Sequence, residues 1–106
     1  MEKAQFIQEN EFQELLQDSL PIVIDYTAHW CGPCRLISPL IDQLASEYQN
    51  RAKVCKIDID DNRDNAKKHG IKSIPAVLFF KNGEVVDTIV GKATYETFKN
   101  TLEKHL

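Results

Sequence analysis

The segment IVIDYTA, residues 22–28, is the strongest constraint on how this chain folds. It is apolar or β-branched at most positions and shows no regular alternation of polar and apolar side chains. A strand of this composition is typical of a sheet that is covered on both faces. Because such a sheet needs helices on either side, the segment predicts an α/β domain.

Segments of strand and helix character alternate along the rest of the chain. We expect strands near residues 6–7 and at 22–28, 54–60, 76–80 and 84–90. We expect helices from Asn10, from the CGPC segment onward, at 61–69 and from Thr94. Strands joined by helices lie parallel, whereas Asn82-Gly83 favours a type I′ turn and an antiparallel hairpin. The predicted order is β-α-β-α-β-α-β-β-α, in a mixed five-stranded sheet flanked by four helices.

Two of these helices have marked local signals. Asn10 is the expected N-cap of the first helix, with Gln13 completing a capping box. The long helix has an apolar face with the spacing expected of an amphipathic helix. We expect this face to contain Leu36, Ile37, Leu40, Ile41, Leu44, Ala45 and Tyr48.

Length and charge limit the classes of protein to which the chain can belong. Its 106 residues suffice for one domain, which we expect to span 1–106. The formal net charge of −3 argues against a nucleic-acid partner, for which a basic face is typical. No apolar run approaches the roughly 18 residues of a membrane span. The opening MEKAQFIQEN does not resemble a signal peptide, so we expect a cytoplasmic location.

Cys31 and Cys34 carry the most specific chemistry in the sequence. A CxxC pair is compatible with a structural disulfide, half of a zinc site or a reversible redox pair. Structural zinc needs about four ligands, and the other cysteine and the histidines supply no second ligand pair. A disulfide across so short a loop constrains the unfolded chain only slightly. We therefore predict a redox pair and no metal.

The two cysteines occupy unequal positions. Cys31 follows the buried strand and opens a helix, where free N–H groups and partial positive charge stabilise a thiolate. Pro33 suits the first turn because it lacks an N–H, and Gly32 keeps the backbone accessible. Cys34 lies about one turn inside the helix. This arrangement predicts Cys31 as the exposed nucleophile and Cys34 as the shielded resolving cysteine.

Asp25 is the one charged residue within the segment 22–28. A buried carboxylate is costly unless it is paired or protonated. Lys56, on the strand expected next to it, is the predicted partner. The pair has a purely structural interpretation, but perturbed carboxylates cluster near catalytic groups. We therefore predict that Asp25 accepts the proton of Cys34.

The chain resembles the thioredoxin family over nearly its whole length. The segments that carry the resemblance are IVIDYTAHWCGPCRLISPLIDQLA, VCKIDID, GIKSIPAVLFFKNGEVV and IVGKA, in the family's order and spacing. The resemblance implies the thioredoxin fold and a monomeric protein-disulfide reductase that needs no cofactor. It also implies a thioredoxin reductase as partner, either an NADPH-dependent flavoprotein or a ferredoxin-dependent enzyme, and target proteins with disulfides.

The resemblance implies roles for further residues. The Ile74–Pro75 bond, which local sequence alone predicts as trans, is implied to be cis and packed against the cysteines. The backbone of Ile74 then pairs with a bound substrate strand. An apolar docking rim for substrate proteins is implied at Trp30, Gly32, Pro33, Ile59, Ile74, Pro75, Val90, Gly91 and Lys92.

Three residues depart from the family pattern. Thr27 stands where Trp is usual, Ala76 where Thr is usual, and Lys92 where a small apolar residue is common. These changes leave the chemistry intact and concern the choice of partner. Two alternative functions remain: an oxidant or isomerase of the same fold, and an interaction module with incidental thiols. Pro33 disfavours the first, because such oxidants usually carry His at that position.

Overall fold

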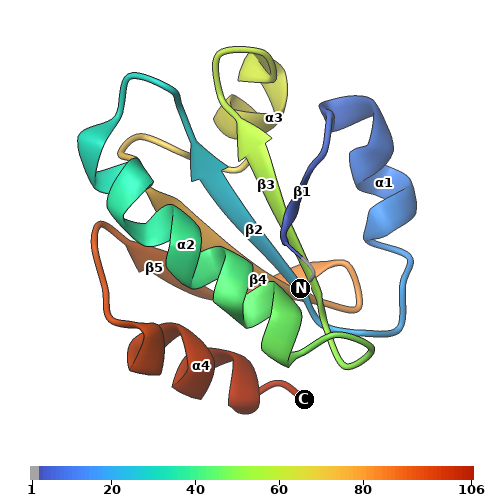
Figure 1. Ribbon diagram of the computed structural model, residues 1–106. Coiled ribbons are helices and arrows are strands. Elements are labelled where there is room, and N and C mark those ends of the chain that lie inside the picture. The colour runs from blue at the N-terminus through green and yellow to red at the C-terminus, as the bar shows by residue number, and fades with distance from the viewer. Residues whose placement is uncertain (1–2) are drawn as a thin grey trace.

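The computed structural model describes residues 3–106, so Met1 and Glu2 of the predicted domain lie outside the described residues. The elements follow the predicted order, with a short 3-10 helix at Glu9–Glu11 before the first α-helix (Figure 1). The strands are β1 (Gln5–Phe6), β2 (Ile22–Thr27), β3 (Lys53–Asp58), β4 (Ala76–Lys81) and β5 (Glu84–Val90). The α-helices are α1 (Phe12–Leu15), α2 (Gly32–Glu47), α3 (Arg63–Lys68) and α4 (Tyr95–Glu103).

The strands form one mixed five-stranded sheet in the order β1-β3-β2-β4-β5. β3 is parallel to β1 and β2, whereas β4 is antiparallel to β2 and β5. β2 therefore lies at the centre, where Asp25 is the register partner of Lys56 on one side and of Val77 on the other. This central position explains why the segment IVIDYT shows no polar face, since both of its faces are covered.

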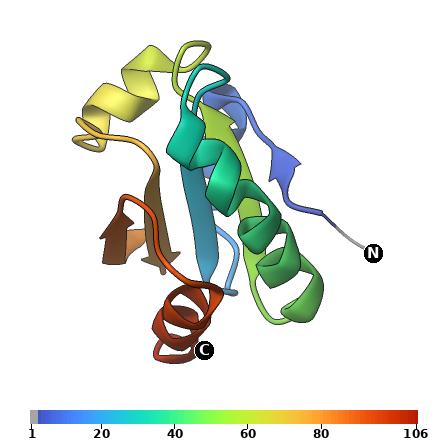
Figure 2. The ribbon, with the colours of Figure 1, turned by 60° about the vertical axis from the view of Figure 1, so that its left-hand side comes forward.

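Two hydrophobic cores fill the space between the sheet and its helices. α2 and α4 cover one face and α1 and α3 the other, as Figures 1 and 2 show. Side chains that point to alternate faces along β2 divide between the two cores. The core under α2 contains, among others, Val23, Val77, Phe79, Ile37, Ile41, Leu44, Phe98 and Leu102. The opposite core contains, among others, Phe12, Ile24, Tyr26, Ile57, Leu78 and Phe80.

Several predicted ends of elements are confirmed by the backbone. Asn82 and Gly83 have φ angles of 54° and 81°, as the type I′ turn between β4 and β5 requires. Gly70 ends the α3 region with a φ of 68°, in the left-handed conformation usual after a helix. At the start of α4, the N–H of Thr97 donates to the Thr94 hydroxyl oxygen over 3.2 Å, which confirms Thr94 as the cap.

The predicted N-cap of the first helix is wrong, because Asn10 lies inside the 3-10 segment and Glu11 is the N-cap of α1. Gln8 is the N-cap of the 3-10 segment, and its N–H donates to the Glu11 carboxylate over 3.0 Å. The predicted pair, Asn10 and Gln13, has no such role. A tertiary contact accounts for the shift, because the N–H of Glu9 donates to Asn62 Oδ1 over 2.7 Å and places this turn against the α3 region.

The prediction for Leu36 is also wrong, because this residue is 62% exposed and does not belong to the buried face of α2. The buried stripe of α2 runs through Ile37, Ile41 and Leu44 at spacings of four and three residues. Leu36 is rotated by about 100° from Ile37 around the helix and so points away from the sheet.

The two leucines of α2 provide a matched test of this assignment. We expect Leu44→Ala to lower the free energy of unfolding by about 2–5 kcal/mol, since it leaves a cavity in the core. Leu36→Ala removes the same atoms from an exposed site and should change that free energy by less than about 0.5 kcal/mol. Urea denaturation of both variants measures the difference, and equal losses would contradict the placement of the two side chains.

Candidate active site

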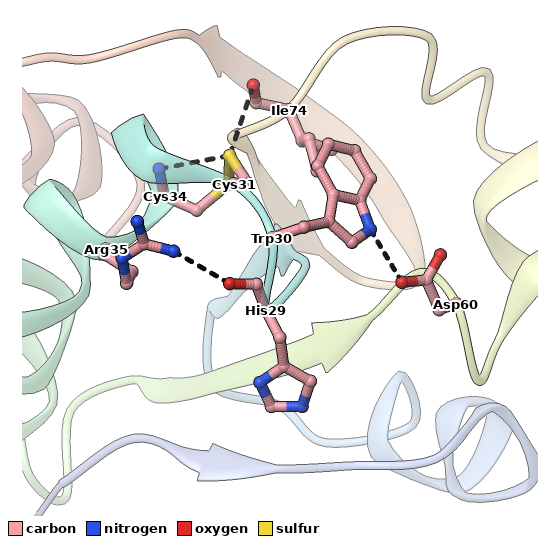
Figure 3. Close-up of a disulfide and its surroundings, with 7 residues drawn as sticks. All are labelled: His29, Trp30, Cys31, Cys34, Arg35, Asp60 and Ile74. Atoms are coloured by element: carbon pink, nitrogen blue, oxygen red, sulfur yellow. Dashed lines mark hydrogen bonds between the residues drawn. A yellow bond between two sulfur atoms is a disulfide. The ribbon is translucent and has the colours of Figure 1, made fainter.

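The Cys31–Cys34 disulfide lies where the chain passes from β2 into α2 (Figure 3). Cys31 is the N-cap residue of α2, and its sulfur accepts a hydrogen bond from the Cys34 N–H over 3.2 Å. Pro33 lies in the first turn of the helix, as predicted. The two Cα atoms are 5.3 Å apart, within the usual range for bonded cysteines. The pair is thus built by a strand, a short loop and a helix N-terminus.

The two cysteines differ less in exposure than predicted. Cys31 is 5% exposed and Cys34 is 1% exposed, so the prediction of an exposed Cys31 is wrong for this disulfide state. The cause is local packing, since Ile59 and Ile74 pack against the pair. Cys31 is nevertheless the more exposed of the two cysteines. Its sulfur faces the Ile74 carbonyl in the close-up of Figure 3, and the distance from the sulfur to the carbonyl oxygen is 3.9 Å.

The Ile74–Pro75 peptide bond is cis, as the resemblance implies. Pro75 is buried, and its carbonyl oxygen accepts the Gly91 N–H over 2.8 Å. Ala76, which follows it, is the register partner of Val90. These contacts hold the segment after β5 beside the loop that faces the disulfide.

The other residues of the predicted docking rim lie around this loop and the disulfide. Trp30 is 65% exposed, and its indole N–H donates to Asp60 Oδ2 over 2.8 Å (Figure 3). Val90 is 59% exposed. Pro33 and Lys92 are also exposed, while Gly32, Ile59, Ile74 and Gly91 are half-buried.

Asp25 is completely buried on the face of β2 that α2 covers. Within residues 3–106, neither of its carboxylate oxygens has a hydrogen-bond partner. Burial raises the pKa of Asp25 to about 7; the charge of Lys56 opposes this shift and that of Asp42 adds to it. A group with a pKa near neutrality both accepts and releases a proton readily. The carboxyl therefore has the property that a proton acceptor at this site needs.

Lys56 lies beside Asp25 in the sheet, but the predicted ion pair between them does not form. Its ammonium donates to Ser38 Oγ over 2.7 Å and pairs with Asp42 Oδ1 over 3.0 Å. The Asp42 side chain is 23% exposed, whereas Asp25 is completely buried. A carboxylate that keeps contact with water costs less to ionise, so the ammonium pairs with Asp42.

Ser38 and Asp42 were missed as site residues, although the sequence holds a signal for them. Cys34, Ser38 and Asp42 are spaced by four residues along α2 and therefore lie on one stripe of the helix. Ser38 and Asp42 thus lie on the helix stripe on which Cys34 stands, and this spacing is the signal for them.

Thr27 borders a cavity of about 140 Å³ next to the disulfide. The cavity is lined by Phe6, Thr27, Ala28, His29, Cys34, Arg35, Ser38 and Asp58. Thr27, one of the three positions that depart from the pattern of the resemblance, thus lines the same cavity as Cys34. Nε2 of exposed His29 lies 3.3 Å from Oδ2 of buried Asp58 at this cavity.

The remaining cysteine is separate from the site. Cys55 is a free, buried cysteine on β3, and burial raises the pKa of its thiol to about 11. A protonated, buried thiol is a poor nucleophile. Among the described residues, no group of three or more His, Cys, Asp or Glu side chains could hold a metal ion. None of the helices in residues 3–106 is long and apolar enough to cross a membrane.

A cysteine pair at the N-terminus of α2, together with a buried carboxyl of near-neutral pKa on the sheet face that α2 covers, is the arrangement of a dithiol–disulfide oxidoreductase. A family model described as Thioredoxin matches residues 3–104. The chain belongs to the thioredoxin family.

Relatives and solved structures agree with this assignment. A protein described as Thioredoxin 1, from Synechococcus elongatus, is 46% identical over 94 residues, which cover 89% of this chain and 88% of that protein. A thioredoxin from Griffithsia pacifica is 42% identical over 106 residues, covering 100% of this chain and 97% of its own. A solved mutant thioredoxin from Halobacterium salinarum is similar with a TM-score of 0.88 at 31% identity, covering 98% of this chain and 90% of that one.

The raised pKa of Asp25 predicts a specific dependence of stability on pH. Between pH 4 and 7 the folded protein keeps a proton on Asp25 that the unfolded chain, with a pKa of 3.8, has released. Stability therefore falls as the pH rises through this range, by on the order of 4 kcal/mol from this group. We expect Asp25→Asn to lack this fall. Urea denaturation of the disulfide form at several pH values measures it, and identical pH profiles for wild type and variant would refute the assignment.

Proposed function

We propose that this chain reduces disulfides of other proteins, with Cys31 as the nucleophile and Cys34 as the resolving cysteine. The observation that carries the proposal is the disulfide at the N-terminus of α2, with Cys31 as the cap residue and Asp25 buried beneath the helix. The free N–H groups of a helix N-terminus stabilise a thiolate at the cap position. Dithiol–disulfide exchange through this pair agrees with membership of the thioredoxin family.

The proposed reaction has two exchange steps. The Cys31 thiolate attacks a substrate disulfide, whose S–S bond breaks, and one substrate sulfur leaves as a thiolate. Cys34 then releases its proton to the Asp25 carboxylate and attacks the Cys31 sulfur. The bond between Cys31 and the substrate breaks, and the second substrate sulfur leaves. The substrate gains two electrons and the cysteine pair loses two, which leaves the Cys31–Cys34 disulfide.

Three further residues of the site act on this chemistry. Lys56 lowers the pKa of Asp25 through its charge and so keeps a fraction of the carboxyl ionised near pH 7. Gly32 leaves space for an incoming sulfur, since a Cβ added there would meet no atom closer than 3.9 Å. Pro33 fits the first turn without loss of a hydrogen bond.

Substrate proteins dock, in this proposal, on the rim around the disulfide. The exposed apolar side chains of Trp30 and Val90 supply contact area, and the Ile74 backbone beside Cys31 pairs with an extended substrate segment. Pro75, through its hydrogen bond with Gly91, holds both sides of the rim together. Half-buried Ile59 and exposed Lys92 complete the proposed surface.

The proposal also requires a partner that restores the dithiol. We infer a thioredoxin reductase, of the NADPH-dependent flavoprotein or the ferredoxin-dependent type. We propose further that the chain acts as a monomer and in the cytoplasm, a reducing compartment in which the pair can be returned to the dithiol state. The net charge of −3 supports a partner other than nucleic acid.

Variants of the two active-site cysteines test the proposed roles. We expect Cys31→Ser to abolish reduction of a disulfide-bonded test protein. Cys34→Ser should instead accumulate a mixed disulfide through Cys31, because the resolving attack is lost. Non-reducing electrophoresis and mass spectrometry of the linked peptides identify the sulfur involved.

The third cysteine supplies the control for this experiment. Cys55→Ser should reduce the test protein as the wild type does, since the Cys55 thiol is buried and protonated. Trapping through Cys55 in the Cys34→Ser variant would overturn the assignment. A reduction potential close to those of strong thiol oxidants would show that the chain oxidises its partners instead.

A further inference from the structure

The Lys56 ammonium is bound by side chains of α2, the helix that covers the sheet face to which Lys56 points. Within residues 3–106 the ammonium has two acceptors, Ser38 Oγ at 2.7 Å and Asp42 Oδ1 at 3.0 Å. These two residues lie about one turn apart on the same helix. The lysine side chain is 6% exposed, so water competes little for these bonds. The position of the positive charge is therefore set by two side chains of α2.

Asp25 lies next to Lys56 in the sheet, but the Lys56 ammonium does not bind its carboxyl. It is the register partner of Lys56, and both side chains point to the face of the sheet that α2 covers. The titratable groups that the packed elements place on this side of the sheet are Asp25 on β2, Cys34 and Asp42 on α2, and Lys56 and Asp58 on β3; the β4 partner of Asp25, Val77, is apolar.

We propose that Ser38 is a positioning residue of the active site, whose hydroxyl, together with Asp42, holds the Lys56 ammonium against α2 and off the Asp25 carboxyl. The proposal rests on the proposed function, because it assigns the control of the group that accepts the Cys34 proton. Ser38 also lines the cavity that Cys34 borders, so the same side chain reaches both the lysine and the surroundings of the resolving cysteine.

Hydrogen-bond satisfaction gives the physical reason why this serine matters. A buried ammonium has three donors, and each one left without an acceptor costs free energy. In residues 3–106 both oxygens of Asp25 lack a partner. When the Ser38 hydroxyl is removed, Asp42 is the one acceptor left of the two, and the unpaired oxygens of Asp25 on the neighbouring strand offer another. The ammonium turns toward the sheet, and a closer positive charge favours the ionised carboxylate.

Substitutions of Ser38 in the full chain test this inference. We expect Ser38→Ala to lower the midpoint of Asp25 titration, followed by carbon NMR of its carboxyl, by about one pH unit. Ser38→Thr keeps the hydroxyl and should keep the midpoint of the wild type. Lys56→Met removes the charge and should move the midpoint upward. In each variant, the pH midpoint of the resolving step should shift in the same direction as the titration midpoint of Asp25.

Ser46→Ala is the matched control, since Ser46 lies on the same helix about two turns further on. It should leave the Asp25 midpoint unchanged. An unchanged midpoint in Ser38→Ala, or an equal fall in Ser46→Ala, would overturn the inference. The titration of Asp25 does not require disulfide reduction, so it tests this inference separately from the proposed function. The proposed function is tested by the Cys31 and Cys34 variants.

Discussion

The packing of α2 across β2 is the contact on which the rest of the structure depends. Ile37, Ile41 and Leu44 of the helix share one core with Val23 of the strand. Asp25 is two residues further along the same face of β2, so the contact that forms the core also removes the carboxyl from water. The same helix presents its N-terminus to Cys31. Core packing, the raised pKa of Asp25 and the environment of the cysteine pair thus have one physical origin.

The polar residues beneath α2 show how a buried and a partly exposed carboxylate take different states. Asp42 keeps partial contact with solvent and holds the Lys56 ammonium, whereas Asp25 has neither water nor a hydrogen-bond partner in the described part of the chain. Desolvation penalises the charged form of a carboxyl, and an ion pair compensates for it. The arrangement keeps the pKa of one carboxyl near neutrality while the adjacent one serves as the counter-ion.

The sequence predicts the fold well, because its signals for the fold are local and repeated. The uninterrupted run at 22–28, the Asn82-Gly83 turn and the Thr94 cap each specify their element without tertiary information. It predicts contacts less well where two partners compete. Lys56 pairs with Asp42 and not with Asp25 because Asp42 stays in contact with water, and the sequence does not show which carboxylate does so. Likewise, the burial of Cys31 follows from Ile59 and Ile74, which reach it from distant segments.

Unequal reactivity of the two active-site cysteines is the central claim, and selective alkylation tests it most directly. The reduced protein is treated near pH 7 with less than one equivalent of iodoacetamide, and the labelled peptides are identified by mass spectrometry. We predict label on Cys31, which caps α2, with Cys34 and Cys55 unmodified. Label distributed equally over Cys31 and Cys34, or found first on Cys55, would contradict the assignment of nucleophile and resolving cysteine.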